Sequence, residues 1–113
     1  MEINETNISM IRGDSETITV YCEDNNGAKV NFETGDTIYL TVKQSVNSER
    51  KILQKIITEF VNGEAIIEIF PEDTKDLSFR TYVYDIQLTR ADGTVTTIIP
   101  PSDFVIEGEV TCQ

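Results

Sequence analysis

The sequence contains no histidine and no tryptophan, and only two cysteines and three prolines among its 113 residues. Without histidine, the chain lacks the side chain that most often acts as a general base or metal ligand. Its serines and cysteines therefore have no imidazole to activate them as nucleophiles. Two cysteines are also too few for the disulfide framework of a small secreted domain. We expect a protein that is not an enzyme, with no catalytic residues, no cofactor and no metal.

Basic residues are scarce. Nine lysines and arginines stand against twenty aspartates and glutamates, which gives a formal net charge of −11. Nucleic-acid binding relies on lysine and arginine side chains that displace counterions from phosphates. An anionic membrane surface repels a chain of this charge. The composition therefore predicts a protein with no nucleic-acid partner and no membrane association.

Long apolar runs are missing as well. No stretch approaches the roughly 18 apolar residues of a membrane-spanning helix. Residues 1–14 include three acidic side chains and do not resemble a secretion signal. Hydrophobic residues nevertheless make up 39% of the chain, as in an ordered globular protein. The length fits one domain, so we predict a single domain over residues 1–113, synthesised in the cytoplasm.

Apolar and polar residues alternate with a period of two along most of the chain, which is typical of strands that bury one face. Turn signals separate these stretches, among them Asp24-Asn25-Asn26-Gly27 and Asp92-Gly93. Pro100-Pro101 is expected to end a strand. The predicted strands cover residues 8–12, 17–22, 37–43, 81–90, 94–99 and 104–111, and the last of them places Phe104, Ile106 and Val110 in the core.

The segment 51–61 fits two patterns. Its apolar residues recur at helical spacing, but Thr58 and three isoleucines disfavour a helix. Asn62-Gly63 follows directly and is the strongest short signal for a β-hairpin. We therefore predict a strand rather than a helix. The hairpin would pair Phe60 with Ala65, Thr58 with Ile67, and Ile56 with Ile69.

Residues 71–77 predict one short helical turn, because Pro71 suits a first helical position and Glu72 and Asp73 suit the positive end of a helix dipole. Combined with the strands, this gives an all-β fold. We predict an immunoglobulin-like antiparallel β-sandwich of about seven to nine strands. A closed barrel is the alternative architecture.

The order in which these sequence signals occur along the chain is similar to their order in a known group of proteins. The pieces, in chain order, are Ile11-Arg12-Gly13-Asp14, Thr34-Gly35-Asp36, Leu40-Thr41-Val42-Lys43, Pro71-Glu72-Asp73-Thr74, Tyr82-Val83-Tyr84-Asp85-Ile86-Gln87-Leu88, Asp92-Gly93-Thr94-Val95, Phe104-Val105-Ile106 and Glu109-Val110-Thr111. Together they resemble β-sandwich modules of tail and baseplate proteins in phages and prophages of Gram-positive bacteria. The N-terminal domain of the baseplate upper protein is one such module. Where these modules often have a Pro-Gly turn after Phe79, this chain has Arg80-Thr81.

The resemblance implies a non-enzymatic structural protein of a phage or prophage virion, in the tail, the baseplate or the head–tail assembly. It implies contacts with other virion proteins and with further copies of the same chain in a homo-oligomer. The expected location is the virion, after synthesis in the cytoplasm of the bacterial host. The family offers no catalytic residues to carry over.

The positive charge that the chain does have is clustered. Residues 43–55 contain Lys43, Arg50, Lys51 and Lys55 with a single acid, so this segment carries +3 and the remainder −14. With Tyr39, which projects from the predicted solvent face, these residues form the candidate assembly surface. A basic end and an acidic remainder would let copies pack head to tail. The alternative is a hairpin whose charges only keep the protein in solution.

A carbohydrate- or cell-surface-binding module of a phage or bacterial adhesin is the alternative function, because Tyr21 and Tyr39 project from the predicted solvent faces, where they could stack on a sugar ring. The same tyrosines would otherwise fill cross-strand pairs or a subunit contact. A calcium-dependent adhesin domain is a third reading, based on acidic residues in the turns. Arg12-Gly13-Asp14 spells an integrin-binding tripeptide but is expected to be a glycine turn.

Three further residues have structural predictions. The Tyr82 hydroxyl is expected to bond to the backbone of the preceding turn, as in a tyrosine corner. Cys22 is expected to be a small buried apolar residue. Cys112 is expected to be a free thiol near the terminus, and a disulfide between the two cysteines is the alternative.

Overall fold

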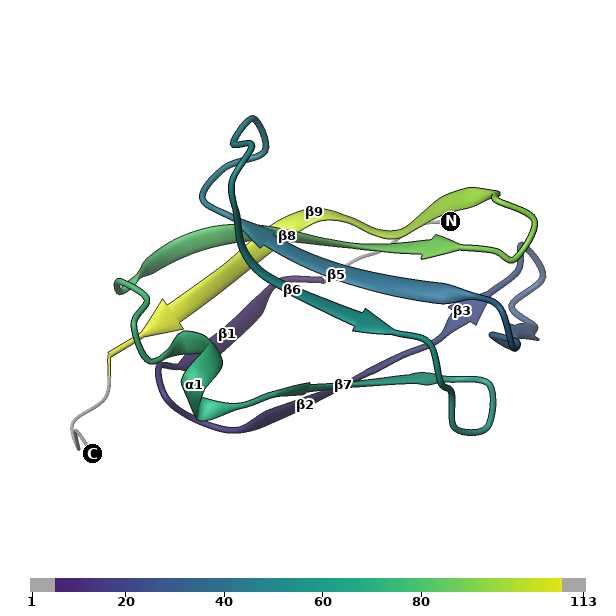
Figure 1. Ribbon diagram of the computed structural model, residues 1–113, viewed down its shortest axis with the longest axis horizontal. Helices are drawn as coiled ribbons and strands as arrows, with labels where there is room; N and C mark the ends of the chain where they lie inside the picture. The colour runs from purple at the N-terminus through teal and green to yellow at the C-terminus, as the bar shows by residue number, and fades with distance from the viewer. Residues whose placement is uncertain (1–5, 109–113) are drawn as a thin grey trace.

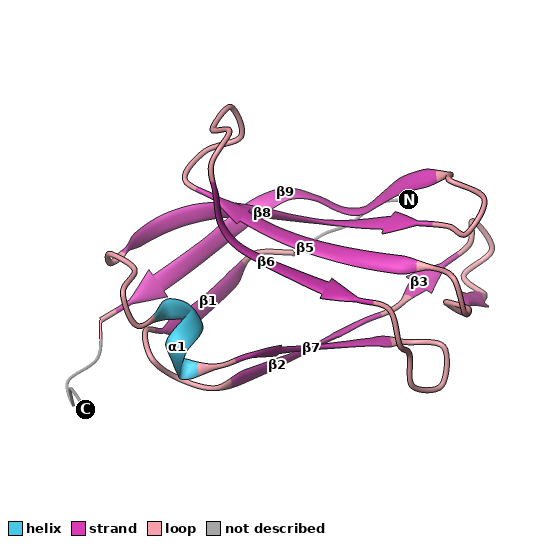
Figure 2. Ribbon diagram, viewed as in Figure 1, coloured by secondary structure: helices cyan, strands magenta, loops and turns pink. Residues whose placement is uncertain are grey.

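The computed structural model describes residues 6–108. Over this range the chain folds into nine strands and one four-residue helix (Figure 2). The elements are β1 (Ile8–Ile11), β2 (Glu16–Val20), β3 (Cys22–Glu23), β4 (Lys29–Val30), β5 (Thr37–Lys43), β6 (Lys51–Ile57), β7 (Ala65–Ile69), α1 (Pro71–Thr74), β8 (Arg80–Thr89) and β9 (Val95–Glu107). The predicted all-β class, the number of strands and the helical turn are confirmed. The immunoglobulin-like topology stays a prediction.

The strands form two layers. A five-stranded sheet, in the order β1-β9-β8-β5-β6, lies over the two-stranded sheet β2-β7 (Figure 1). A small third pair, β3-β4, lies at one end of the molecule. The pairs are antiparallel except one: β1 runs parallel to β9, with Ile8 opposite Phe104.

The core lies between the two layers. Inward-facing residues, which alternate with outward-facing ones along the strands, fill it. Every second residue of β5 is buried, and so is every second residue of β8 from Tyr82 onward. The β7 residues Ala65, Ile67 and Ile69 approach them from the other layer and are also buried. The largest fully buried side chains come from the two layers and α1, and they are Phe104, Ile38, Leu40, Ile67, Ile69, Ile106, Val42 and Thr74. The predicted core positions of Phe104 and Ile106 are confirmed, whereas Val110 lies outside the described residues.

The segment 51–61 contains a strand and no helix, as predicted, but the strand β6 ends at Ile57 and the predicted hairpin is wrong. Ile56 lies opposite Tyr39 of β5, not Ile69, and Ile67 lies opposite Ile18 of β2, not Thr58. Only the bridge between Val61 and Glu64 spans the Asn62-Gly63 turn. The reason is that residues 58–60 leave the five-stranded sheet and cross to the other layer. A turn at 62–63 therefore reverses the chain direction without joining β6 to β7 in one sheet.

Pro100-Pro101 does not end a strand, which corrects the second local prediction. β9 continues through both prolines from Val95 to Glu107. Tyr84 lies opposite Ser102 and Ile86 opposite Ile99, so the two prolines together oppose one β8 residue. This is a β-bulge, where a missing backbone N–H does not interrupt the hydrogen-bond ladder.

The single helix of the described chain is not a membrane segment. It is neither long nor apolar enough to cross a membrane.

Candidate binding site

The outer face of the five-stranded sheet, turned away from β2-β7, is hollowed into a cleft of about 390 Å³. The loop between β5 and β6 rises above this face (Figure 1). The floor of the cleft is built by outward-facing residues of two paired strands. They are Tyr39, Thr41 and Lys43 of β5 and Val83, Asp85 and Gln87 of β8.

Alternation explains why these side chains meet. The neighbours of the β5 floor residues point into the core, so the floor residues themselves must point outward. Residues directly opposite each other in an antiparallel pair share a face. The register places Gln87 opposite Tyr39 and Asp85 opposite Thr41. Residues 44 or more positions apart in the sequence thus become cross-strand neighbours.

The walls come from the strands on either side and from the loop. On β6, the Gln54 side-chain amide donates a 3.0 Å hydrogen bond to the Thr41 hydroxyl. Lys51 of β6 lies opposite Lys43 of β5. Val46 of the 44–50 loop and Val95 of β9 also line the cleft, and their side chains are 62% and 59% exposed. Apolar side chains, Val46, Val83 and Val95, thus lie among the polar and charged groups of the cleft.

Charge in the cleft is mixed. Burial raises the pKa of the Asp85 carboxyl above its ordinary value, and the nearby Lys43 ammonium opposes that rise. Among the described residues, neither Lys43 nor Lys51 has a carboxylate within the 4.0 Å of an ion pair. Two ammonium groups and one carboxylate leave the cleft with a net charge of about +1, opposite in sign to the whole chain.

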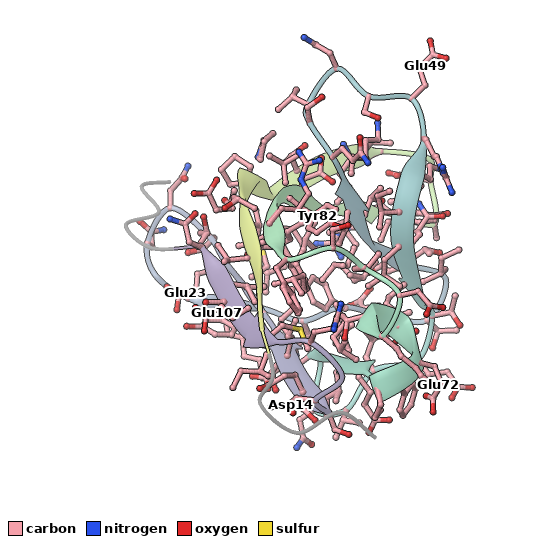
Figure 3. The ribbon with its side chains drawn as sticks, turned by 90° about the vertical axis from the view of Figure 1, so that its left-hand side faces the viewer. Asp14, Glu23, Glu49, Glu72, Tyr82 and Glu107 are labelled. Carbon is pink, nitrogen blue, oxygen red and sulfur yellow. The ribbon has the colours of Figure 1, made fainter. Side chains whose placement is uncertain are left out.

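The structure brings together three of the five residues of the candidate assembly surface. Tyr39, Lys43 and Lys51 all line the cleft, whereas Arg50 belongs to the exposed 44–50 loop and does not. At the tip of that loop, Glu49 projects away from the sheet, on the opposite side of the molecule from Asp14 and Glu72 (Figure 3).

Lys55 lies apart from the other four residues. It is opposite the buried Leu40 and so points to the inner side of the sheet. Its ammonium group is 2.7 Å from the Asp73 carboxylate of α1 and 5.0 Å from the centre of the Phe70 ring. Lys55 therefore joins the two layers instead of contributing to an outer basic face.

Sequence reasoning missed most of the polar floor. Alternation in each strand places Thr41, Asp85 and Gln87 on the face away from the core, but no pattern in the sequence indicates that the two strands pair. No sequence pattern places Gln54 on the outer face, because apolar and polar residues do not alternate clearly over residues 51–57. The pairing of β5 with both β6 and β8 is what gathers them.

Arg12-Gly13-Asp14 is a turn, as predicted. Gly13 has φ +85°, and its N–H donates a 2.8 Å hydrogen bond to the buried Thr74 hydroxyl of α1. The Arg12 guanidinium donates to the Leu77 carbonyl at 3.2 Å and lies 4.0 Å from the centre of the Phe79 ring. The tripeptide therefore docks against the segment that follows α1.

The predicted tyrosine corner is confirmed. The buried Tyr82 hydroxyl donates a 3.2 Å hydrogen bond to the Ser78 carbonyl. Cys22 is half-buried against the core, less than predicted, and Cys112 lies outside the described residues, as does any bond between them. Tyr21 is 54% exposed and lies outside the cleft.

Within residues 6–108, no three acidic or cysteine side chains are grouped so that they could hold a metal ion. Comparison of the chain with protein families, with curated proteins and with solved structures gives no match.

Proposed function

We propose that the chain is a non-enzymatic structural module of a phage or prophage virion, in the tail, the baseplate or the head–tail assembly, and that it works through protein–protein contacts. One observation carries the proposal: within residues 6–108, the sequence pieces that resemble such modules occupy the turns and strands that define this fold. The resemblance therefore concerns the scaffold as a whole and not an isolated motif.

Three of these pieces show the point. The Gly13 turn is held by Thr74, the last residue of α1. Asp36 precedes β5 and is buried, and its carboxylate accepts a 2.8 Å hydrogen bond from Arg90, which follows β8. Contacts of this kind hold the scaffold together and leave its outer surfaces free to suit different partners.

The free edge of the five-stranded sheet supports a role in contacts. β6 is the last strand in the sheet order, and its outer edge has no paired strand within the described chain. Seven residues of backbone are thus open to strand addition by a partner. Beside this edge, the Ile56 side chain is 55% exposed. Edges of this kind are a common basis of protein assembly.

The test measures whether the chain is a component of purified phage particles. Prophages of the source strain are induced, and particles are purified by density gradient and compared with the unfractionated lysate by quantitative mass spectrometry. The proposal expects the chain to be enriched in the particles in a fixed ratio to the major capsid protein, and immunogold labelling to place it at one location. A chain that is abundant in the lysate but depleted from the particles contradicts the proposal.

A carbohydrate- or cell-surface-binding module is the second candidate function. The cleft on the outer sheet face favours it, because Tyr39 lies there beside amide, hydroxyl and carboxylate groups. One protein can both belong to a virion and bind a saccharide, so the two candidate functions need separate tests.

A further inference from the structure

We propose that the cleft on the outer face of the five-stranded sheet binds a saccharide that carries one negative charge per sugar residue, such as a uronate. The proposal deepens the second candidate function by naming a ligand class and does not depend on the virion role. It rests on the size of the cleft, the chemistry of its floor and the sign of its charge.

The size suits a small part of a sugar chain. Sites for small ligands occupy roughly 300–1,000 Å³ and combine apolar walls with a few polar groups. At about 390 Å³, the cleft is at the lower end of that range. It is built on paired strands, which hold the floor side chains in fixed positions, and this reduces the entropy lost on binding.

The polar groups of the floor match sugar hydroxyls, which both donate and accept hydrogen bonds. The Asp85 carboxylate accepts, and the Gln87 amide both donates and accepts. Gln54 already donates to Thr41, which leaves its amide oxygen free to accept from a ligand. Donors and acceptors therefore alternate across the floor within the reach of one or two sugar rings.

Tyr39 supplies the apolar contact that a sugar ring needs. It is half-buried in the floor, with Gln87 opposite on β8 and Ile56 opposite on β6. Aromatic rings offer a large rigid surface at a low cost in conformational entropy, and a hydroxyl at one end. The C–H face of a sugar can pack on this ring while its hydroxyls reach the flanking amides and carboxylate.

Charge narrows the ligand to a sugar whose ring in the cleft carries a single carboxylate. Lys43 and Lys51 face each other across β5 and β6, and in the described chain no carboxylate forms an ion pair with either. One sugar ring with one negative charge inside the cleft balances the net charge of about +1 that Asp85 leaves. A phosphate dianion would exceed it and meet repulsion from Asp85. Lysines are compact point charges that impose no forked geometry, as an arginine would.

The test is a titration of the ¹⁵N-labelled full chain, followed by amide chemical shifts at low salt. Four probes are compared: digalacturonate, neutral maltose, glucose 6-phosphate and the acidic peptide hexaglutamate. The proposal expects saturable shifts with digalacturonate in 39–43, 51–54 and 83–87. We expect digalacturonate to bind about tenfold more tightly than maltose and than glucose 6-phosphate, a factor that added salt reduces.

Two variants and their matched controls locate the site. Tyr39→Ala is expected to abolish saturable binding, whereas Tyr21→Ala, which removes an exposed tyrosine outside the cleft, is expected to leave it unchanged. Lys43→Gln with Lys51→Gln is expected to remove the preference of about tenfold for digalacturonate over maltose. Arg50→Gln removes a charge next to Lys51 but outside the cleft, and is expected to retain most of that preference.

Four results would overturn the proposal. The first is the absence of saturable shifts with either disaccharide at millimolar concentration, and the second is shifts confined to other faces. The third is tighter binding of hexaglutamate than of digalacturonate, which would make the cleft a docking surface for an acidic protein segment. The fourth is a loss of the preference for digalacturonate in Arg50→Gln that is as large as the loss in a Lys51→Gln single variant. The preference would then come from the overall charge of the protein and not from the cleft. None of these results bears on the particle test of the virion role.

Discussion

The Arg90 guanidinium donates a 2.8 Å hydrogen bond to the Asp36 carboxylate, and so ties the end of β8 to the start of β5. Asp36 is only 4% exposed, and its carboxylate also accepts a 2.9 Å hydrogen bond from the Glu33 backbone N–H. A buried carboxylate is stable only when its charge is paired in this way. The pair holds together the two strands that form the floor of the cleft.

Asp36→Ala is expected to lower the free energy of unfolding by about 3 kcal/mol. The substitution removes one partner of this ion pair, and it also removes the carboxylate that accepts the Glu33 N–H in the 33–36 turn. The measurement is urea unfolding followed by circular dichroism at pH 7. Asp76→Ala removes an equal charge at an exposed position and serves as control. If the two variants differ by less than about 0.5 kcal/mol, the pair has no structural importance.

Tyr82→Phe is expected to cost about 1 kcal/mol, because the Ser78 carbonyl loses its hydroxyl donor while the ring stays in place. Thermal unfolding measures the loss. Tyr21→Phe, at an exposed tyrosine, is expected to leave the melting temperature unchanged. Equal melting temperatures for Tyr82→Phe and the unaltered protein would refute the role of the tyrosine corner.

Thr74→Val is expected to destabilise the fold by about 1–3 kcal/mol, because a side chain of equal shape replaces the hydroxyl that accepts the Gly13 N–H. Hydrogen exchange should show faster exchange of the Gly13 amide. Thr74→Ser keeps the hydroxyl, so the Gly13 amide should retain its protection in that variant. An unchanged exchange rate in Thr74→Val would show that this hydrogen bond does not hold the turn.

Asp85→Asn is expected to alter stability in a pH-dependent way. Burial raises the pKa of Asp85 in the folded protein above its ordinary value of 3.8, so the ionised carboxylate destabilises the fold. That cost is absent below the unfolded pKa and appears as the pH rises through the folded pKa. The variant should therefore melt at a higher temperature than the unaltered protein at pH 7, and at the same temperature near pH 3.

Calorimetry at both pH values tests this expectation. Asp76→Asn removes an exposed carboxylate and reports the part of the gain that comes from lowering the net negative charge. A gain for Asp85→Asn at pH 7 that does not exceed the gain for Asp76→Asn would show that burial of Asp85 does not matter.

Much of the fold follows from alternation, because a strand that buries one face must repeat every two residues. That argument found β5 and β8 with their buried faces. It does not say which strand pairs with which, since pairing depends on contacts between distant residues. Asn62-Gly63 illustrates the limit: its local geometry favours a turn, and the turn formed, but burial of Ile67 required β2 as its partner.

The candidate site was predictable in part for the same reason. The alternation of β5 placed Tyr39 and Lys43 on an outer face. Lys55 was misplaced because 51–57 is apolar on both faces, so its register against β5 could not be read from the pattern. Asp85 entered the site only through the pairing of β8 with β5.

The parallel pairing of β1 with β9 has a consequence for how the chain folds. Ser9 donates a 2.6 Å hydrogen bond to Glu107, 98 residues away, so the first strand takes its place only against the last. During synthesis, β1 emerges from the ribosome before β9, and it cannot pair until residue 107 has also emerged. Contacts of such high sequence separation slow folding. Closure of this sheet edge is therefore a late event, and β1 is exposed to competing strands until it occurs.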